Sequence, residues 1–158
     1  MRGLSAIRTK KVLVSSGAWH TGAITHSEFP LSHVHKLRLS KAWNWCVVDA
    51  EGGGQQYKVL VAFDPGKRQY WAWLGAVFGS DQAVVARVEF HASHDGWHCH
   101  WKTGALVDVP RGAVKASGKG ELRHGCSGDP PDVSKLDAFK VAFKLFNVHH
   151  DVGFVFGS

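Results

Sequence analysis

The sequence predicts an α+β fold, in which an antiparallel β-meander sheet of about five to seven strands is packed by a C-terminal helix. Between residues 42 and 102, short runs of β-branched and aromatic residues alternate with turn-forming Gly, Pro and Asp. After residue 134, apolar residues recur at helical spacing instead. The length of 158 residues and the hydrophobic content of 44% fit a single domain over residues 1–158.

The central strands are separated by short, turn-forming segments. We expect strands at residues 43–49, 57–63, 69–74, 83–90 and 97–102, preceded by a short strand at residues 11–14. The rest of residues 1–35 shows no clear pattern. Connections this short favour antiparallel neighbours, because parallel strands need a long crossover.

The C-terminal part of the chain predicts one helix and a last short strand. Ser134 suits the N-cap, and Asp137 follows three positions later. The apolar residues at helical spacing are Leu136, Phe139, Phe143 and Phe146. This stripe is expected to face the sheet, and residues 152–156 are expected to form the final strand.

The charge of the chain indicates its class of partner, and its cysteine content indicates its location. The formal charge of +6 favours an anionic partner, either nucleic acid, a phosphorylated ligand or an acidic protein surface. Three cysteines without Cys-x-x-Cys spacing indicate reduced thiols and a cytoplasmic location. Apolar runs are far shorter than the ~18 residues that span a bilayer, so we expect no membrane partner.

The segment 84–103 is the most informative part of the chain. Asp95-Gly96 predicts a two-residue hairpin turn that places His91 opposite His100 and Glu89 opposite Lys102. Strand alternation then gathers polar side chains on one face: Arg87, Glu89, His91, His98, His100 and Lys102. The opposite, apolar face collects Val88, Phe90, Cys99 and Trp101.

Three interpretations of the polar face remain open. Imidazoles on one face can ligate a divalent metal (Zn²⁺, Mn²⁺ or Mg²⁺), here through His91, His98 and His100 with Glu89 as a fourth ligand. Without a metal, the same histidines and Lys102 can act as catalytic groups on a phosphodiester. The third interpretation is a solvated polar face without chemistry.

A His-x-His strand that holds a metal is also typical of endonucleases that nick single-stranded DNA, and residues 96–100 have a passing likeness to it. Those enzymes need a tyrosine nucleophile. This chain offers only Tyr57 and Tyr70, both within predicted strands and upstream of the histidines. We therefore do not assign that family.

Ligand contacts are expected from cations next to the histidines and in the glycine-bearing loop at residues 110–131. These are Arg87, Arg111, Lys115, Lys119 and Arg123. The loop is either a solvated connector or a basic flap that closes over an anion. Five tryptophans lie in strand-like stretches, where core packing is expected and a base-stacking platform is the alternative: Trp43, Trp45, Trp71, Trp73 and Trp101.

Together these observations predict a small basic protein that binds nucleic acid or a phosphorylated ligand through a histidine-rich hairpin face. If the protein is an enzyme, the residues favour a metal- or histidine-dependent phosphodiesterase or nuclease. The alternative is a non-catalytic protein-interaction module, an inhibitor or a subunit of a larger assembly, whose basic surface meets an acidic partner.

Overall fold

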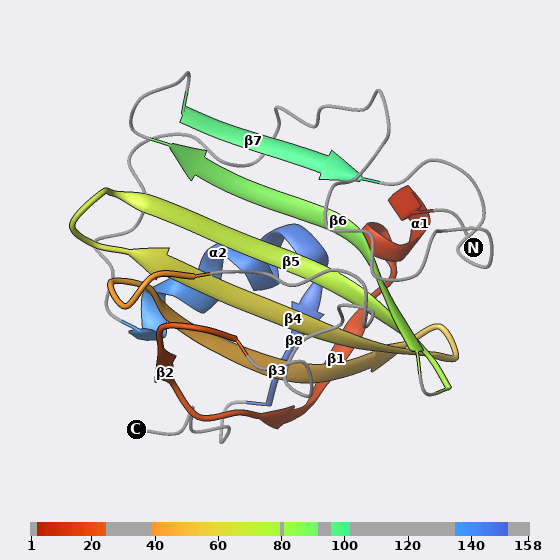
Figure 1. Cartoon of the computed structure of the whole chain (residues 1–158). Coiled ribbons are helices and arrows are strands. Elements are labelled where there is room, and N and C mark those ends of the chain that lie inside the picture. The colour runs from red at the N-terminus through yellow and green to blue at the C-terminus, as the bar shows by residue number, and fades with distance from the viewer. Residues whose placement is uncertain (1–2, 25–38, 80, 92–95, 102–134, 152–158) are drawn as a thin grey trace.

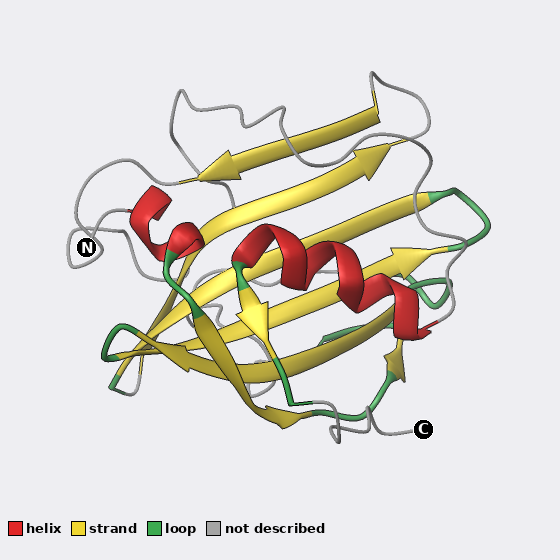
Figure 2. Ribbon diagram, turned by 180° about the vertical axis from the view of Figure 1, so that it is seen from behind, coloured by secondary structure: helices red, strands yellow, loops and turns green. Residues whose placement is uncertain are grey.

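The computed structural model describes residues 3–24, 39–79, 81–91, 96–101 and 135–151, which form an α+β fold. A curved, mixed sheet carries both described helices on one face (Figures 1 and 2). Helix α1 is Gly3–Arg8 and helix α2 is Lys135–Phe146. Neither helix in the described part of the chain has the length and apolarity needed to cross a membrane.

Among the described residues, eight strands make up the sheet, in the order β7-β6-β5-β4-β3-β1-β8, with β2 paired to β3. The bounds are Lys11–Ser16 (β1), His20–Thr21 (β2), Asn44–Gly52 (β3), Gln55–Asp64 (β4), Gln69–Phe78 (β5), Asp81–His91 (β6), Gly96–Trp101 (β7) and Val148–His149 (β8). Described neighbours are antiparallel except β1 and β8, which run parallel.

The expected α+β class fits the structure, but the expectation of a simple antiparallel meander is wrong. Strands β3 to β7 do follow one another across the sheet, but β1 lies beyond β3 and β8 pairs parallel with β1. The parallel strand arises where α2 ends. Asn147 has a positive φ of 53°, which ends the helix, and Lys11 N donates to Asn147 O at 2.9 Å. The last strand expected at residues 152–156 lies outside the described residues.

Each face of the sheet carries its own apolar cluster. On the helix face, three residues of the stripe predicted for α2 are buried, and Phe139, Phe143 and Phe146 belong to the cluster between α2 and the sheet. Tyr70 from β5 anchors the helix, because its hydroxyl donates to Ala138 O at 2.6 Å. The second cluster lies on the opposite face and contains Leu39, Trp43, Trp45, Val47, Leu60, Ala62, Trp73 and Val84.

Both helices end at one buried lysine. Lys11 is completely buried at the start of β1, and its ammonium donates to the carbonyl oxygens of Ala6, Thr9 and Phe146. Carbonyl groups at helix C-termini lack partners within the helix and carry partial negative charge, so a cation satisfies them well. Burial lowers the pKa of Lys11 to about 8. Nothing in the local sequence predicts this role.

Candidate functional site

Strands β6 and β7 form the predicted hairpin, but in a different register. His91 lies opposite Gly96, Glu89 opposite His98, and Arg87 opposite His100. The predicted pairing of His91 with His100 is therefore wrong. Strand β6 ends at His91 and β7 begins at Gly96, so four residues connect them instead of two.

Cross-strand pairs explain why the observed register is favoured over the one that an Asp-Gly turn would set. It places Phe90 opposite Trp97, with ring centroids 5.2 Å apart, and brings His100 Nε2 to 3.4 Å from Glu89 Oε1. Aromatic and oppositely charged pairs each stabilise a sheet by roughly 0.2–1 kcal/mol. Several such pairs outweigh the local preference of two turn residues.

The predicted division into two faces is correct despite the register error. The partner of His91 changes by four positions, and an even shift leaves every side chain on the same face. Val88, Phe90 and Cys99 are buried in the cluster below α2, and Trp101 packs partly buried against it. The other side, which we call the histidine face, contains Arg87, Glu89, His91, His98 and His100.

Glu89 is the centre of the histidine face. Its Oε1 lies 3.2 Å from Arg87 Nη2 and 3.4 Å from His100 Nε2, and its Oε2 lies 3.5 Å from His91 Nε2. These four side chains are 14–24% exposed. One carboxylate thus pairs with three basic groups, which share it at the partly buried surface of the sheet.

His98 stands between the other two histidines. Its ring centroid is 6.4 Å from that of His100, at an interplanar angle of 18°, and 6.3 Å from that of His91. Within the described ranges, no carboxylate lies at ion-pair distance from His98. The histidines therefore differ: two border Glu89, whereas His98 does not.

Arg87 keeps one buried donor without an acceptor in the described structure. Its Nη2 pairs with Glu89, but its Nε is buried and has no hydrogen-bond acceptor among the residues that the structure describes. Trp71 Nε1, opposite Glu89 in the register, is in the same condition. A buried donor left unsatisfied costs about 1–3 kcal/mol, so an added oxygen acceptor near this face would be favourable.

Tryptophans continue the histidine face across the sheet. Trp71 pairs with Glu89 and Trp73 with Arg87, and their ring centroids are 6.0 Å apart. Trp43 lies 4.5 Å from Trp71. Because Trp43, Trp45 and Trp73 are at most 5% exposed, their predicted role in the core is correct. Sequence reasoning did not connect these rings to the histidines, although alternation along β5 could have revealed it.

The predicted metal site at His91, His98, His100 and Glu89 stays a prediction. In the described part of the chain, no group of three or more His, Cys, Asp or Glu side chains is arranged so that it could hold a metal ion. Glu89, the one carboxylate of the predicted set, already pairs with Arg87 at 3.2 Å. The structure thus offers no geometry from which to derive a metal-dependent step.

Several predicted site residues cannot be placed. Lys102 and the loop cations Arg111, Lys115, Lys119 and Arg123 lie outside the described residues. Their contribution to ligand binding stays a prediction. Of the three cysteines, Cys46 and Cys99 are buried free thiols, and Cys126 also lies outside the described ranges.

Neither tyrosine can serve the histidine face as a nucleophile. Tyr57 and Tyr70 are buried in the cluster below α2, on the opposite side of the sheet. Burial raises the pKa of Tyr57 to about 12, and the Tyr70 hydroxyl donates to Ala138 O. Covalent tyrosine chemistry at the histidines is therefore incompatible with this arrangement.

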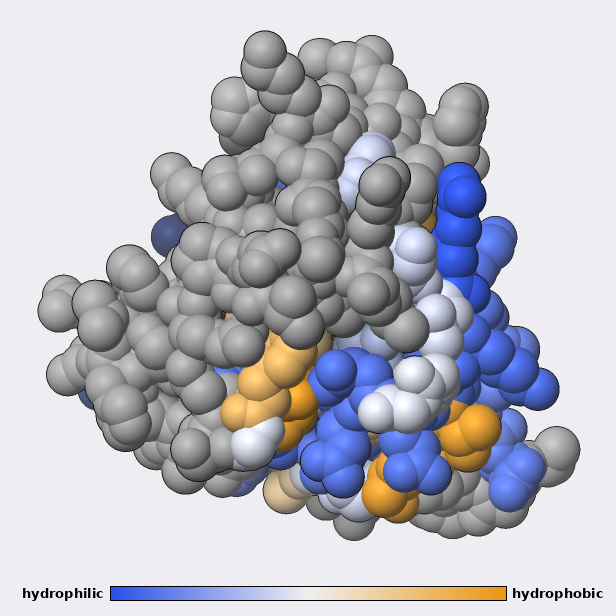
Figure 3. All heavy atoms as spheres, turned by 90° about the vertical axis from the view of Figure 1, so that its right-hand side faces the viewer, coloured by the Kyte–Doolittle hydropathy of each residue, from blue (hydrophilic) through white to orange (hydrophobic). Residues whose placement is uncertain are grey.

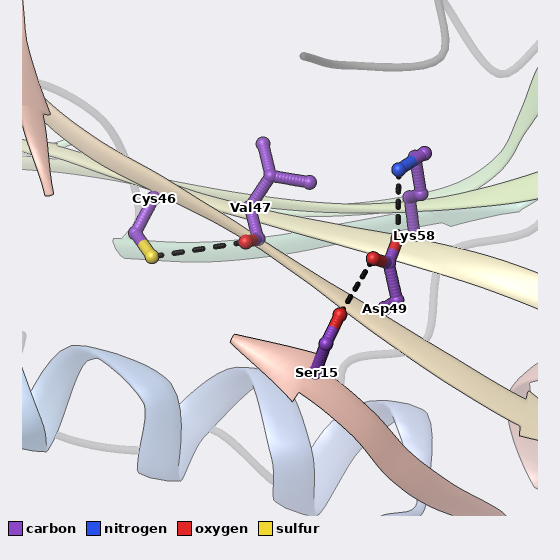
Figure 4. Close-up of polar contacts among 5 residues, drawn as sticks. All are labelled: Ser15, Cys46, Val47, Asp49 and Lys58. Carbon is purple, nitrogen blue, oxygen red and sulfur yellow. Dashed lines mark hydrogen bonds and ion pairs between the residues drawn. The ribbon is translucent and has the colours of Figure 1, made fainter. Parts of the chain in front are cut away.

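A second polar cluster lies on strands β1, β3 and β4 (Figure 4). Asp49 accepts hydrogen bonds from the Ser15 hydroxyl and from Lys58 Nζ, both at 2.7 Å. Each pair is a cross-strand neighbour in the register, and Asp49 is 45% exposed. We therefore assign this cluster to sheet stability, where exposed pairs of this kind contribute about 1 kcal/mol or less.

Comparisons with protein-family models, with curated proteins and with solved structures find no match for this chain. In the described structure, the histidine face brings an arginine, a glutamate and three histidines together.

Proposed function

We propose that this protein binds a phosphorylated ligand or nucleic acid on the histidine face. The observation that carries the proposal is the convergence of Arg87, His91 and His100 on the single carboxylate of Glu89, with the His98 ring beside both histidines. Imidazole and guanidinium N–H groups are good donors to phosphate oxygens, and hydrogen bonds to charged groups are roughly twice as strong as neutral ones.

Partial burial of these side chains supports binding. Arg87 is 15% exposed and His100 is 24% exposed, so a ligand can reach both at a surface where water screens charge less than in bulk solvent. Glu89 offsets one positive charge of the face. The formal charge of +6 on the whole chain adds long-range attraction for a polyanion.

The surface offers little support for an apolar protein-binding site. Val12 and Val14 are the exposed large hydrophobic residues in the part of the chain that the structure describes. On the side shown in Figure 3, described hydrophobic residues form small separate areas among hydrophilic ones. Interface cores are usually more apolar than this. Binding to a protein partner is therefore the alternative that the binding experiment below tests.

The test is a titration of a fluorescent single-stranded oligonucleotide, followed by polarisation at several salt concentrations. We expect the logarithm of the association constant to fall linearly with the logarithm of salt, by about 0.7 per phosphate contacted. Arg87→Ala should weaken binding about tenfold, because it removes a charged donor. Competition with pyrophosphate separates recognition of a small phosphorylated ligand from recognition of a strand.

Matched controls make the result specific. Arg8→Ala removes the same charge from an exposed position on α1, and His149→Ala removes an exposed imidazole from β8, at the far edge of the sheet. Both controls should bind almost as well as the wild type. If the wild type shows no salt-sensitive binding, or if Arg8→Ala weakens binding as much as Arg87→Ala, the histidine face is not the site and an acidic protein partner becomes the better hypothesis.

A further inference from the structure

We infer that the histidine face cleaves RNA without a metal ion, using His98 as general base and His100 as general acid. This inference rests on the proposed function, because the phosphodiester must first bind on that face. It goes further, since it specifies the class of polymer, the reaction and the role of each group.

The first support is the placement of the two imidazoles. His98 and His100 are two residues apart on β7, so the strand holds both on one face. Their ring centroids are 6.4 Å apart and nearly parallel. A tetrahedral phosphate can sit across two rings at this separation. General acid and base groups held within hydrogen-bond reach of the same phosphate are what phosphodiester transfer requires.

The second support is the difference between the two rings. Glu89 Oε1 lies 3.4 Å from His100 Nε2, where a carboxylate compensates the charge of a protonated ring and restricts its orientation. His98 has no such carboxylate in the described structure. We therefore assign the proton donor to His100, the proton acceptor to His98, and a positioning role to Glu89.

Arg87 supplies the remaining requirement. It lies opposite His100 in the register, so its guanidinium is next to the proposed acid. Its Nε lacks an acceptor among the described residues. A guanidinium beside the reacting phosphate stabilises the negative charge that builds up on its oxygens. Lys102, which also carries this role in the sequence prediction, lies outside the described ranges.

These groups are sufficient for transesterification. His98 removes the proton from the ribose 2′-hydroxyl, whose oxygen attacks the adjacent phosphorus. The bond from phosphorus to the 5′-oxygen breaks, and His100 donates a proton to that oxygen. The products are a 2′,3′-cyclic phosphate and a 5′-hydroxyl end. The step needs no oxidant, metal or water.

The reaction explains why RNA is the substrate class. The 2′-hydroxyl is the nucleophile, so the enzyme needs none of its own. This agrees with the described part of the chain, where Cys99, Tyr57 and Tyr70 are buried on the side of the sheet opposite the histidine face. DNA and 2′-O-methyl RNA should bind but remain intact.

The experiment incubates the full chain with fluorescent single-stranded RNA, with 2′-O-methyl RNA and with DNA of the same sequence, each in excess EDTA. We expect cleavage of RNA alone, with a 2′,3′-cyclic phosphate identified by mass spectrometry. His98→Ala and His100→Ala should each slow cleavage about 10²–10⁴-fold, a much larger factor than the loss of oligonucleotide affinity that removal of one phosphate donor causes. Their double variant should be little worse than either single one.

Each alternative outcome has a distinct meaning. Salt-sensitive binding without RNA cleavage overturns this inference and leaves the proposed function standing. If the wild-type protein neither binds nor cleaves RNA, both this inference and the proposed function are overturned. Cleavage that EDTA abolishes points to the metal interpretation instead. His149→Ala, purified in the same way, should keep the full rate; if His98→Ala and His149→Ala preparations cleave equally well, the activity does not belong to the histidine face.

Discussion

Lys11 Nζ donates a hydrogen bond to the carbonyl oxygen of Phe146 at 2.7 Å, across 135 residues of sequence. The same ammonium bonds to the carbonyl oxygen of Thr9 at 2.8 Å and lies 5.0 Å from the centre of the Tyr57 ring. It therefore joins the ends of both helices to the first strand. We therefore expect the stability of the fold to depend on this buried lysine.

Replacing Lys11 by Met is expected to destabilise the fold by about 1–3 kcal/mol at pH 7, because buried carbonyl oxygens lose their donor while the volume of the side chain is retained. Denaturant unfolding measures the change. Lys10→Met is the matched control, since Lys10 is the adjacent exposed lysine. Equal stability of the two variants would show that the contacts of Lys11 contribute nothing.

Stability should depend on pH in the alkaline range. Burial lowers the pKa of Lys11 from 10.5 to about 8. Between these values the unfolded chain binds more protons than the folded one, so the free energy of unfolding rises with pH, by on the order of 2–3 kcal/mol at pH 10. Lys11→Met should lack this rise. A wild-type curve parallel to that of the variant from pH 8 to pH 10 would contradict the expectation.

Tyr57 should produce the opposite trend at higher pH. Its pKa is raised from 10.0 to about 12, so between these values the folded chain keeps a proton that the unfolded chain has lost. The free energy of unfolding should therefore fall from pH 10 upwards. Tyr57→Phe removes the titrating group, and its unfolding free energy, measured beside that of the wild type from pH 9 to pH 11.5, should decline less steeply. An equally steep decline in both would assign the effect to other groups.

The histidine face should contribute more to function than to folding. Trp73→Ala should cost about 3–5 kcal/mol, because this ring is 2% exposed in the second apolar cluster. His98→Ala, on the same face, should cost less than about 1 kcal/mol. Thermal melts and RNA cleavage on the same preparations decide the matter. A His98→Ala variant that melts as early as Trp73→Ala would mark His98 as structural.

Glu89→Gln should separate binding from chemistry. Removing one negative charge from the histidine face is expected to raise oligonucleotide affinity about two- to fivefold at low salt, because the carboxylate repels phosphate. Cleavage should fall at least about tenfold, since His100 loses its positioning partner. Glu51→Gln, at an exposed position on β3, makes the same change in net charge. If Glu89→Gln and Glu51→Gln change affinity and cleavage rate equally, Glu89 acts only through the net charge of the protein.

The hydrogen bond between the sheet and α2 can be tested in isolation. Tyr70→Phe removes only the hydroxyl that donates to Ala138 O. The expected loss is about 1–2 kcal/mol, because a buried carbonyl is left without this donor. Unfolding followed by far-ultraviolet circular dichroism would show whether α2 is lost before the sheet. Unchanged stability would mean that apolar packing alone holds the helix.

Local patterns were informative wherever structure depends on neighbours in sequence. Phe139, Phe143 and Phe146 predicted the buried stripe of α2, and the turn-forming segments predicted the order of strands β3 to β7. Helix α1 and strands β2 and β8 were missed. Helix α1 has six residues, and β2 and β8 have two each, which is too short for a periodic signal to develop.

The sequence by itself determined which side chains share a face of the β6–β7 hairpin, because alternation is a property of each strand and survives any even shift of register. Only the tertiary structure decided that Glu89 lies between Arg87 and His100, and that His91 faces Gly96. Register results from competition among cross-strand pairs, turn preferences and packing on the rest of the sheet. The burial of Lys11 has the same origin, since its partners come from two helices at opposite ends of the chain.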